Sequence, residues 1–232
     1  TQQGFIQLGL FNAANQWRLV ADFLPQVLGG VLLPMVASST TKKSNNALEA
    51  INVLAGWFIV SVLALPIMAF PEIVGWLYGK EYISDTFYNS LAIVMYVSCI
   101  ISYRQGIARK LIVNNLMWWG FLDNLLWAIF FIMLVFLLKG LGSVGLALSH
   151  LIAYILNTLI FVPFYLNRKV VPKHLIVSKE VGLIWGVLSL QIIGIILNFS
   201  LIIRAFLFLI GVWILFASYK TIWVKSNKYL HC

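Results

Sequence analysis

Polar or small residues recur at helical spacing near the start of an otherwise apolar chain. They are Asn12, Asn15, Gln16, Arg18, Asp22, Gln26, Gly29 and Gly30. On a helix with 100° per residue they share an arc of about 160°, and the opposite arc carries no polar side chain. Their amide, guanidinium and carboxylate groups can offer hydrogen bonds and charge to water or to a ligand. The pattern predicts a helix with one face toward apolar neighbours and the other toward a wet cavity.

Arg18 and Asp22 are one helical turn apart in this stretch. A charge in the middle of a bilayer costs at least about 2.5 to 3.5 kcal/mol, so we expect both side chains to face the cavity and to pair. An alternative places Arg18 near the outer boundary of the membrane, where its long side chain reaches the interface and neutralises Asp22. Asp22 and Gln26 lie deeper, and this alternative explains them less well.

Three other residues could carry chemistry. Asp123 is the most deeply placed carboxylate, and it has three open interpretations: binding a cation, taking up a proton, or pairing with a neighbouring helix. His150 either titrates near neutral pH or makes a hydrogen bond between helices. Arg104 closes an apolar stretch, where it either anchors the end of the helix or meets an anionic headgroup. The candidates for coupling to an ion or proton gradient are therefore Asp22, Asp123 and His150.

Composition predicts the elements that hold these residues. Of 232 residues, 62% are hydrophobic and 10% are charged, against about 25% charged in a soluble domain. Because each membrane-crossing helix needs about 20 apolar residues, we expect an all-α polytopic membrane protein. Seven apolar stretches have suitable lengths. They are residues 13–38, 50–71, 88–108, 116–138, 143–166, 181–199 and 202–222.

The net charge of +9 is spread over alternate loops between these stretches. One set of loops holds Lys42, Lys43, Arg104, Arg109, Lys110, Arg168, Lys169, Lys173, Lys179, Lys220, Lys225 and Lys228, and the other holds Lys80, Lys139 and Arg204. Cytoplasmic loops are enriched in Lys and Arg, which predicts a cytoplasmic C-terminus and an outside start. This dispersal argues against a nucleic-acid partner. The start without Met or a leader suggests a piece of a longer protein, with an odd number of spans upstream.

Enzyme and cofactor motifs are weak or missing. Gly140, Gly142 and Gly145 match GxGxxG, but an apolar span precedes them where a dinucleotide site needs a strand. Small residues there are better explained by close helix contact. The sequence contains no P-loop, HExxH, metal-ligand cluster or nucleophile elbow, and Cys99 and Cys232 form no CxxC pair. We expect no cofactor, no metal and no enzymatic activity.

Three sequence segments carry a resemblance to a known family. Residues 8–18 read LGLFNAANQWR, and this segment continues to FLP at 23–25 and LP at 33–34. Residues 73–82 read IVGWLYGKEY, and residues 142–147 read GSVGLA. Together they resemble bacterial O-antigen flippases, in the polysaccharide transporter branch of the superfamily that includes the MATE drug exporters.

The resemblance implies a fold of two six-helix lobes facing a central cavity. Residues 1–166 would form the C-terminal lobe without its first helix, and residues 167–232 two further transmembrane helices and a cytoplasmic tail. Five or seven spans would then lie upstream, giving 12 or 14 in all.

The resemblance also implies a function in the bacterial inner membrane. The family carries undecaprenyl-diphosphate-linked oligosaccharide units to the periplasmic leaflet, in contact with membrane lipid and alongside other O-antigen assembly proteins. By this resemblance Arg18 and Arg104 would contact the diphosphate or acidic sugars. The amides of Asn12, Asn15, Gln16 and Gln26 would bind sugar hydroxyls.

Three other functions compete with this one. A drug or cation exporter of the same superfamily predicts a cavity dominated by carboxylates. A membrane-embedded glycan polymerase or ligase generally has a large periplasmic loop, whereas no loop here exceeds about 20 residues. A non-transporting scaffold is the third.

Overall fold

The computed structural model describes residues 2–38 and 42–228, and the side chains of residues 2–38 and 48–225. Nearly all of these residues are helical, and none of them lies in a strand. The side chains of Lys42, Lys43 and Lys228, which belong to the predicted cytoplasmic set, lie outside the described residues.

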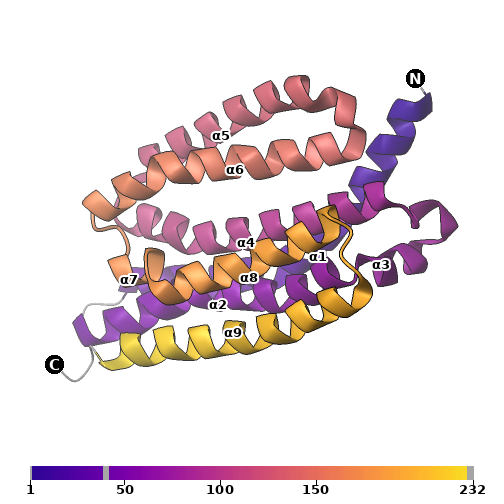
Figure 1. Ribbon diagram of the computed structural model, residues 1–232. Coiled ribbons are helices and arrows are strands. Elements are labelled where there is room, and N and C mark those ends of the chain that lie inside the picture. Colours follow the sequence, from indigo (N-terminus) through magenta and orange to yellow (C-terminus); the bar gives the residue numbers. More distant parts are fainter. Residues whose placement is uncertain (1, 39–41, 229–232) are drawn as a thin grey trace.

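The helices run alongside one another in one bundle (Figure 1). They are α1 (Gln2–Ser38), α2 (Lys42–Ala69), α3 (Pro71–Tyr78), α4 (Asp85–Val113), α5 (Met117–Leu138), α6 (Gly142–Asn167), α7 (Lys173–Ile176), α8 (Lys179–Ile196) and α9 (Leu201–Lys228), with short 3₁₀ turns η1 (Lys80–Tyr82) and η2 (Lys139–Leu141). The start of α1 and α3 lie at one end of the bundle, and α7 and the end of α9 at the other (Figure 1). The two predicted sets of loops are thus at opposite ends.

Six segments of the described chain are long and apolar enough to cross a membrane, and one of them, Met117–Asn167, contains both α5 and α6. The predicted spans fall on the seven longest helices, so the all-α class is confirmed. The boundaries differ in places. Helix α1 begins well before residue 13, α4 continues past residue 108, and α8 ends at Ile196 because Asn198 takes a positive φ of 51°.

Helix α4 is the centre of the bundle, between the α5–α6 hairpin and the layer of α2, α8 and α9 (Figure 1). An aromatic cluster fills the core beside it. The fully buried Trp57 ring of α2 lies 4.8 Å from Tyr103, 5.0 Å from Trp185 and 5.5 Å from Tyr219, measured between ring centroids. Aromatic pairs at such distances add to the free energy of burial.

Helices α2 and α4 approach each other closely at Gly106. A Cβ atom at this position would lie 2.6 Å from the Cα atom of Val53. The side-chain amide of Asn52 donates to the Gly106 carbonyl at 2.8 Å. A small residue and a polar side chain therefore join the two backbones, as is common between membrane helices.

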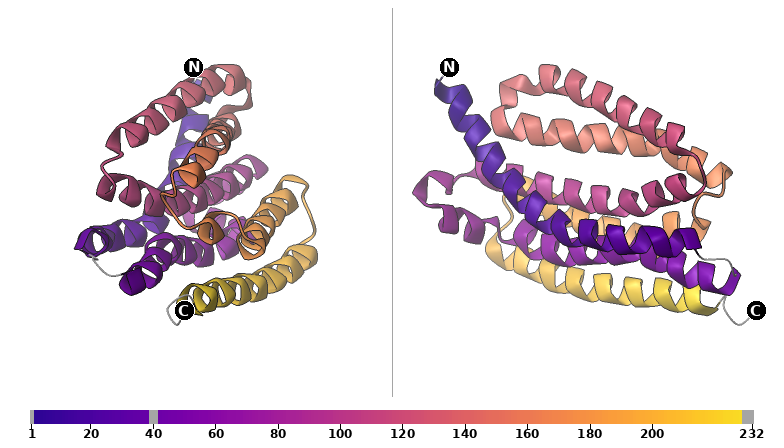
Figure 2. Two further views of the ribbon diagram at one scale, coloured as in Figure 1. Left: turned by 90° about the vertical axis from the view of Figure 1, so that its left-hand side faces the viewer. Right: turned by 180° about the vertical axis from the view of Figure 1, so that it is seen from behind.

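Helix α1 changes direction along its length (Figure 2), and Pro25 and Pro34 lie inside it. A proline removes a helical hydrogen bond and so permits such a bend. The face that packs on the bundle contains Ala13, Ala14, Ala21, Asp22 and Pro25. The predicted division of α1 is therefore only partly right, because the polar Asp22 is buried and part of the apolar arc, including Val20 and Val27, is exposed.

Candidate functional site

Arg18 and Asp22 form an ion pair on α1, as their spacing predicts. Arg18 Nη1 donates to Asp22 Oδ2 at 3.3 Å, and Arg18 Nε donates to Asn15 Oδ1 at 2.7 Å. From α4, the Ser98 hydroxyl donates to Asp22 Oδ1 at 2.5 Å. The Asp22 side chain is 1% exposed. Its charge is therefore compensated inside the bundle by a guanidinium and a hydroxyl.

The Arg18 guanidinium keeps an open side. Its side chain is 22% exposed, and its Nε and Nη1 donate to neighbours on the same helix. A guanidinium has five N–H donors in a planar fork, so further donors remain for a ligand. These bonds direct the side chain toward Asp22, one turn deeper, rather than simply outward to the interface.

Arg104 of α4 and Asp123 of α5 form a second ion pair, with Arg104 Nη2 bound to both carboxylate oxygens. Each side chain is 12% exposed. Two groups from α6 also donate to this carboxylate: the Asn157 side-chain amide at 2.5 Å and the Tyr165 hydroxyl at 2.8 Å. Of the three interpretations of Asp123, pairing with a neighbouring helix is the one the geometry supports.

Arg104 is not at a helix end, which corrects the predicted boundary of that span. Helix α4 continues to Val113, so Arg104 lies more than two turns inside it. Its guanidinium also lies 5.5 Å from the centroid of the Tyr154 ring of α6, a distance typical of cation–π contacts. The buried Nη1 atom of Arg104 has no hydrogen-bond partner among the described residues.

The two ion pairs belong to one polar region between α1, α4, α5 and α6. The phenol of Tyr154 interacts electrostatically with all four charges, those of Arg18, Asp22, Arg104 and Asp123. We call these five residues the charged network. Each positive charge in it has a carboxylate partner, so the network is neutral as a whole.

His150 lies among aromatic rings. Its centroid is 4.2 Å from Phe131, 5.8 Å from Trp127 and 5.9 Å from Phe11. In the part of the chain that the structure describes, no side chain forms the interhelical hydrogen bond that was one of its two interpretations. The rings around His150 are aromatic, and the charged Arg18 side chain interacts with its imidazole electrostatically.

The predicted amide row is divided. Asn12, Gln16 and Gln26 are exposed on α1, whereas Asn15 is half-buried and bound to Arg18. The three exposed amides remain available to a ligand or to a neighbouring structure. They do not form one continuous surface with Asp22, which is turned into the bundle.

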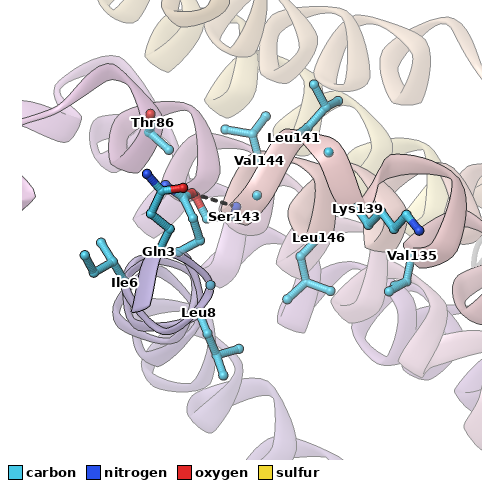
Figure 3. Close-up of a pocket in the computed structure, with 14 residues that line it drawn as sticks. Gln3, Ile6, Leu8, Thr86, Val135, Lys139, Leu141, Ser143, Val144 and Leu146 are labelled. Atoms are coloured by element: carbon cyan, nitrogen blue, oxygen red, sulfur yellow. Dashed lines mark hydrogen bonds between the residues drawn. The ribbon is translucent and has the colours of Figure 1, made fainter. Parts of the chain in front are cut away.

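A groove of about 1010 Å³ opens at the end of the bundle where α1 begins, between the first turns of α1 and the start of α6. Figure 3 shows Gln3, Ile6 and Leu8 on one side of it and Leu141, Val144 and Leu146 on the other. The Ser143 backbone amide donates to Gln7 Oε1 at 3.0 Å across this boundary. None of the predicted site residues lines this groove.

Three polar contacts in the structure were not predicted from the sequence. Arg109, assigned there to a loop, lies in α4 and donates to the Asn52 side-chain oxygen at 2.6 Å and to its carbonyl at 2.7 Å. Lys110 pairs with Glu49 at 2.6 Å. At the opposite end of the bundle, Arg204 is buried and pairs with Glu72 at 2.5 Å. Each partner is on another helix, so sequence spacing gave no signal.

The described residues contain no group of three or more His, Cys, Asp or Glu side chains placed to hold a metal ion. Family models, curated proteins and solved structures were compared with the chain, and none matches it. The fold defines an all-α protein whose helices are long and apolar enough to cross a membrane, with charged side chains paired between them.

Proposed function

We propose that this chain is part of a flippase that moves undecaprenyl-diphosphate-linked O-antigen units from the cytoplasmic to the periplasmic leaflet of a bacterial inner membrane. The observation that carries the proposal is Arg18, an arginine inside an apolar helix whose partly exposed guanidinium lies on the same helix as the exposed amides of Asn12, Gln16 and Gln26. A diphosphate and several sugars cannot cross hydrocarbon unaided, and they need a hydrated path with hydrogen-bond donors and positive charge.

In this proposal Arg18 contacts the diphosphate or an acidic sugar. Asn12, Gln16 and Gln26 then bind sugar hydroxyls along the same helix. Asp22 has a positioning role, because it holds the guanidinium of Arg18 from one turn away. The lipid tail remains in the membrane while two lobes alternate in access to the path.

The role of Arg104 in the proposal differs from the role expected from its sequence position. Since its Nη2 is bound to Asp123, only the Nη1 side is left for an anion. This atom is buried, so in the proposal Arg104 binds an anion only in a state of the cycle in which the atom becomes accessible.

A cation exporter is the nearest alternative, and the geometry favours it less. Such an exporter needs carboxylates that can bind the cargo or a coupling ion. Asp22 and Asp123 are both occupied, each by an arginine and by at least one hydroxyl donor. A cation would have to displace an arginine from either site.

Complementation tests the proposed function. The protein containing this chain, in full-length form, is expressed in a strain that lacks its O-antigen flippase and has a matching repeat unit, and the polymer ladder is examined. Arg18→Ala should abolish the ladder and Arg18→Lys should keep part of it. Arg168→Ala, at an exposed arginine that ends α6, is the matched control and should leave the ladder intact.

A charge swap separates ligand binding from structure. Arg18→Asp combined with Asp22→Arg keeps an ion pair one turn apart but moves the guanidinium. If Arg18 only neutralises Asp22, the swapped protein should support a ladder. If Arg18 binds the substrate, it should not, although membrane levels remain normal. A stable wild-type protein that gives no ladder would rule out the flippase function itself.

A further inference from the structure

An apolar groove runs between the first half of α2 and the last half of α9, away from the charged network. Its volume is about 440 Å³. The lining includes Ile51, Leu54, Phe58, Phe216, Tyr219 and Trp223. The two helices lie side by side in Figure 1, and the groove is near the end of the bundle where α9 finishes.

The groove is shaped to hold a hydrocarbon chain. Leu54 and Tyr219 are buried and form its floor. The Phe58 ring packs edge-on against Tyr219 at 4.5 Å and against Phe216 at 5.3 Å, which fixes one wall. Because both helices cross the apolar region, the surrounding solvent at this surface is lipid rather than water. An acyl chain matches such walls, because most of the lining side chains are aliphatic or aromatic.

A positive charge stands at the mouth of the groove. Lys220 lines it and is exposed, one turn after Phe216 and three residues before Trp223, so the three share one face of α9. Lys220 makes no ion pair or hydrogen bond within residues 2–38 and 48–225. The neighbouring Lys225 does, to Glu180 at 2.6 Å. The Lys220 ammonium is therefore available to an external anion.

The location of Lys220 matches that of a lipid headgroup. Trp223 is partly exposed beside it, and indole rings concentrate at the membrane interface. The loops at this end are the lysine- and arginine-rich set, which predicts the cytoplasmic side, where anionic lipids attract basic residues.

We propose that this groove binds an anionic phospholipid, with one acyl chain between α2 and α9 and the headgroup phosphate paired with Lys220. The proposal is independent of the flippase function, since it needs neither a substrate cavity nor transport. It assigns a lipid-binding role to α9, a helix that contributes no residue to the charged network.

Lipid binding is measured with the purified full-length protein in nanodiscs that contain equal amounts of phosphatidylglycerol and phosphatidylcholine, followed by native mass spectrometry of the retained lipid. Wild-type protein should retain phosphatidylglycerol about fivefold over phosphatidylcholine. This ratio corresponds to the ~1 kcal/mol that a lysine near an anionic lipid contributes. Lys220→Gln should reduce the ratio to about one while still retaining lipid.

Two further variants make the test specific. Ala55→Trp fills the groove from α2 and should reduce the retention of both lipids, with Ala55→Leu as a milder version if the larger side chain disturbs folding. Lys139→Gln removes an exposed lysine at the opposite end and should leave the ratio unchanged.

Three results would overturn the proposal. One is a wild-type ratio near one, and another is a Lys139→Gln effect equal to that of Lys220→Gln. The third is a competition result: undecaprenyl phosphate displaces bound phosphatidylglycerol at much lower concentrations than added phosphatidylglycerol does. That result would identify the occupant as an isoprenoid lipid.

Discussion

Arg104 and Asp123 join the central helix α4 to the peripheral helix α5 through a guanidinium bound to both oxygens of one carboxylate. Helix α5 is apolar apart from the adjacent Asp123 and Asn124, so it has no polar stripe along its length to fix its rotation. Asp123 supplies that fixation, because it receives hydrogen bonds from Arg104, Asn157 and Tyr165. The ion pair thus determines which side of α5 faces the bundle.

Replacing Asp123 with Leu should therefore be strongly destabilising. It leaves the Arg104 charge buried without its partner, and breaking a buried pair in this way costs about 3 to 5 kcal/mol. Unfolding of the purified protein in mixed micelles measures this change in free energy.

The matched control for Asp123 is Glu180→Gln, which removes the carboxylate partner of the largely exposed Lys225. Exposed pairs contribute about 0 to 1 kcal/mol, so this variant should differ little from wild type. Arg104→Met with Asp123→Leu should recover most of the loss, since no charge is then left unpaired. A double variant as unstable as the single one would show that the pair is not the cause.

Gly106→Ala should weaken the contact between α2 and α4. The new methyl group would lie within 3 Å of the Val53 Cα atom and of the Asn52 carbonyl oxygen, which are both backbone atoms that cannot move aside easily. Overpacking of this kind costs about 1 to 3 kcal/mol. Gly186→Ala, inside α8 with open space around it, should be neutral or stabilising by up to about 1 kcal/mol. Thermal unfolding of the two variants compares them directly.

Trp57→Ala should cost about 3 to 5 kcal/mol, because it leaves a large cavity among Tyr103, Trp185 and Tyr219. Trp213→Ala removes the same side chain from the outer surface of α9, where it is 72% exposed, and should change stability by less than about 0.5 kcal/mol. Near-UV circular dichroism during chemical unfolding follows both variants. Equal losses would contradict the buried aromatic cluster.

Arg204→Met should loosen the segment that connects α2 with α4. The guanidinium of Arg204 donates to the Ala69 carbonyl at 3.1 Å and pairs with Glu72, so it ties the start of α9 to the start of α3. Hydrogen exchange of the α3 backbone amides should become faster in this variant. The reason is that α3 can then open locally without first breaking the bonds to Arg204. Lys80→Met, at an exposed lysine nearby, should leave the exchange of α3 unchanged.

The positions of the long helices along the chain were largely predictable, because apolar runs of membrane-crossing length are separated by charged loops. The extension of α4 past the predicted boundary has a specific physical cause. Arg104, Arg109 and Lys110 were assigned to the end of a span because an unpaired charge is costly in lipid. Helix α4 includes all three, since Asp123, Asn52 and Glu49 compensate them from neighbouring helices.

Part of the candidate site was predictable for a similar reason. Arg18 and Asp22 pair within one helix, so their spacing alone brings them together. Arg104 and Asp123 pair between helices. Their contact depends on the rotation of α5, and the otherwise apolar sequence of α5 does not predict that rotation. The aromatic rings around His150 of α6 come from α1 and α5, so the sequence of α6 alone does not reveal them.

The hydrogen bond from the Ser143 amide to Gln7 has a consequence for how the protein is made. It satisfies one of the free N–H groups at the start of α6 with a side chain that lies 136 residues earlier. Because α1 is synthesised before α6, the Gln7 acceptor is already present when the α5–α6 hairpin forms. The first turn of α6 is completed only when the hairpin docks beside α1, so this bond favours the correct order of assembly over the folding of α6 alone.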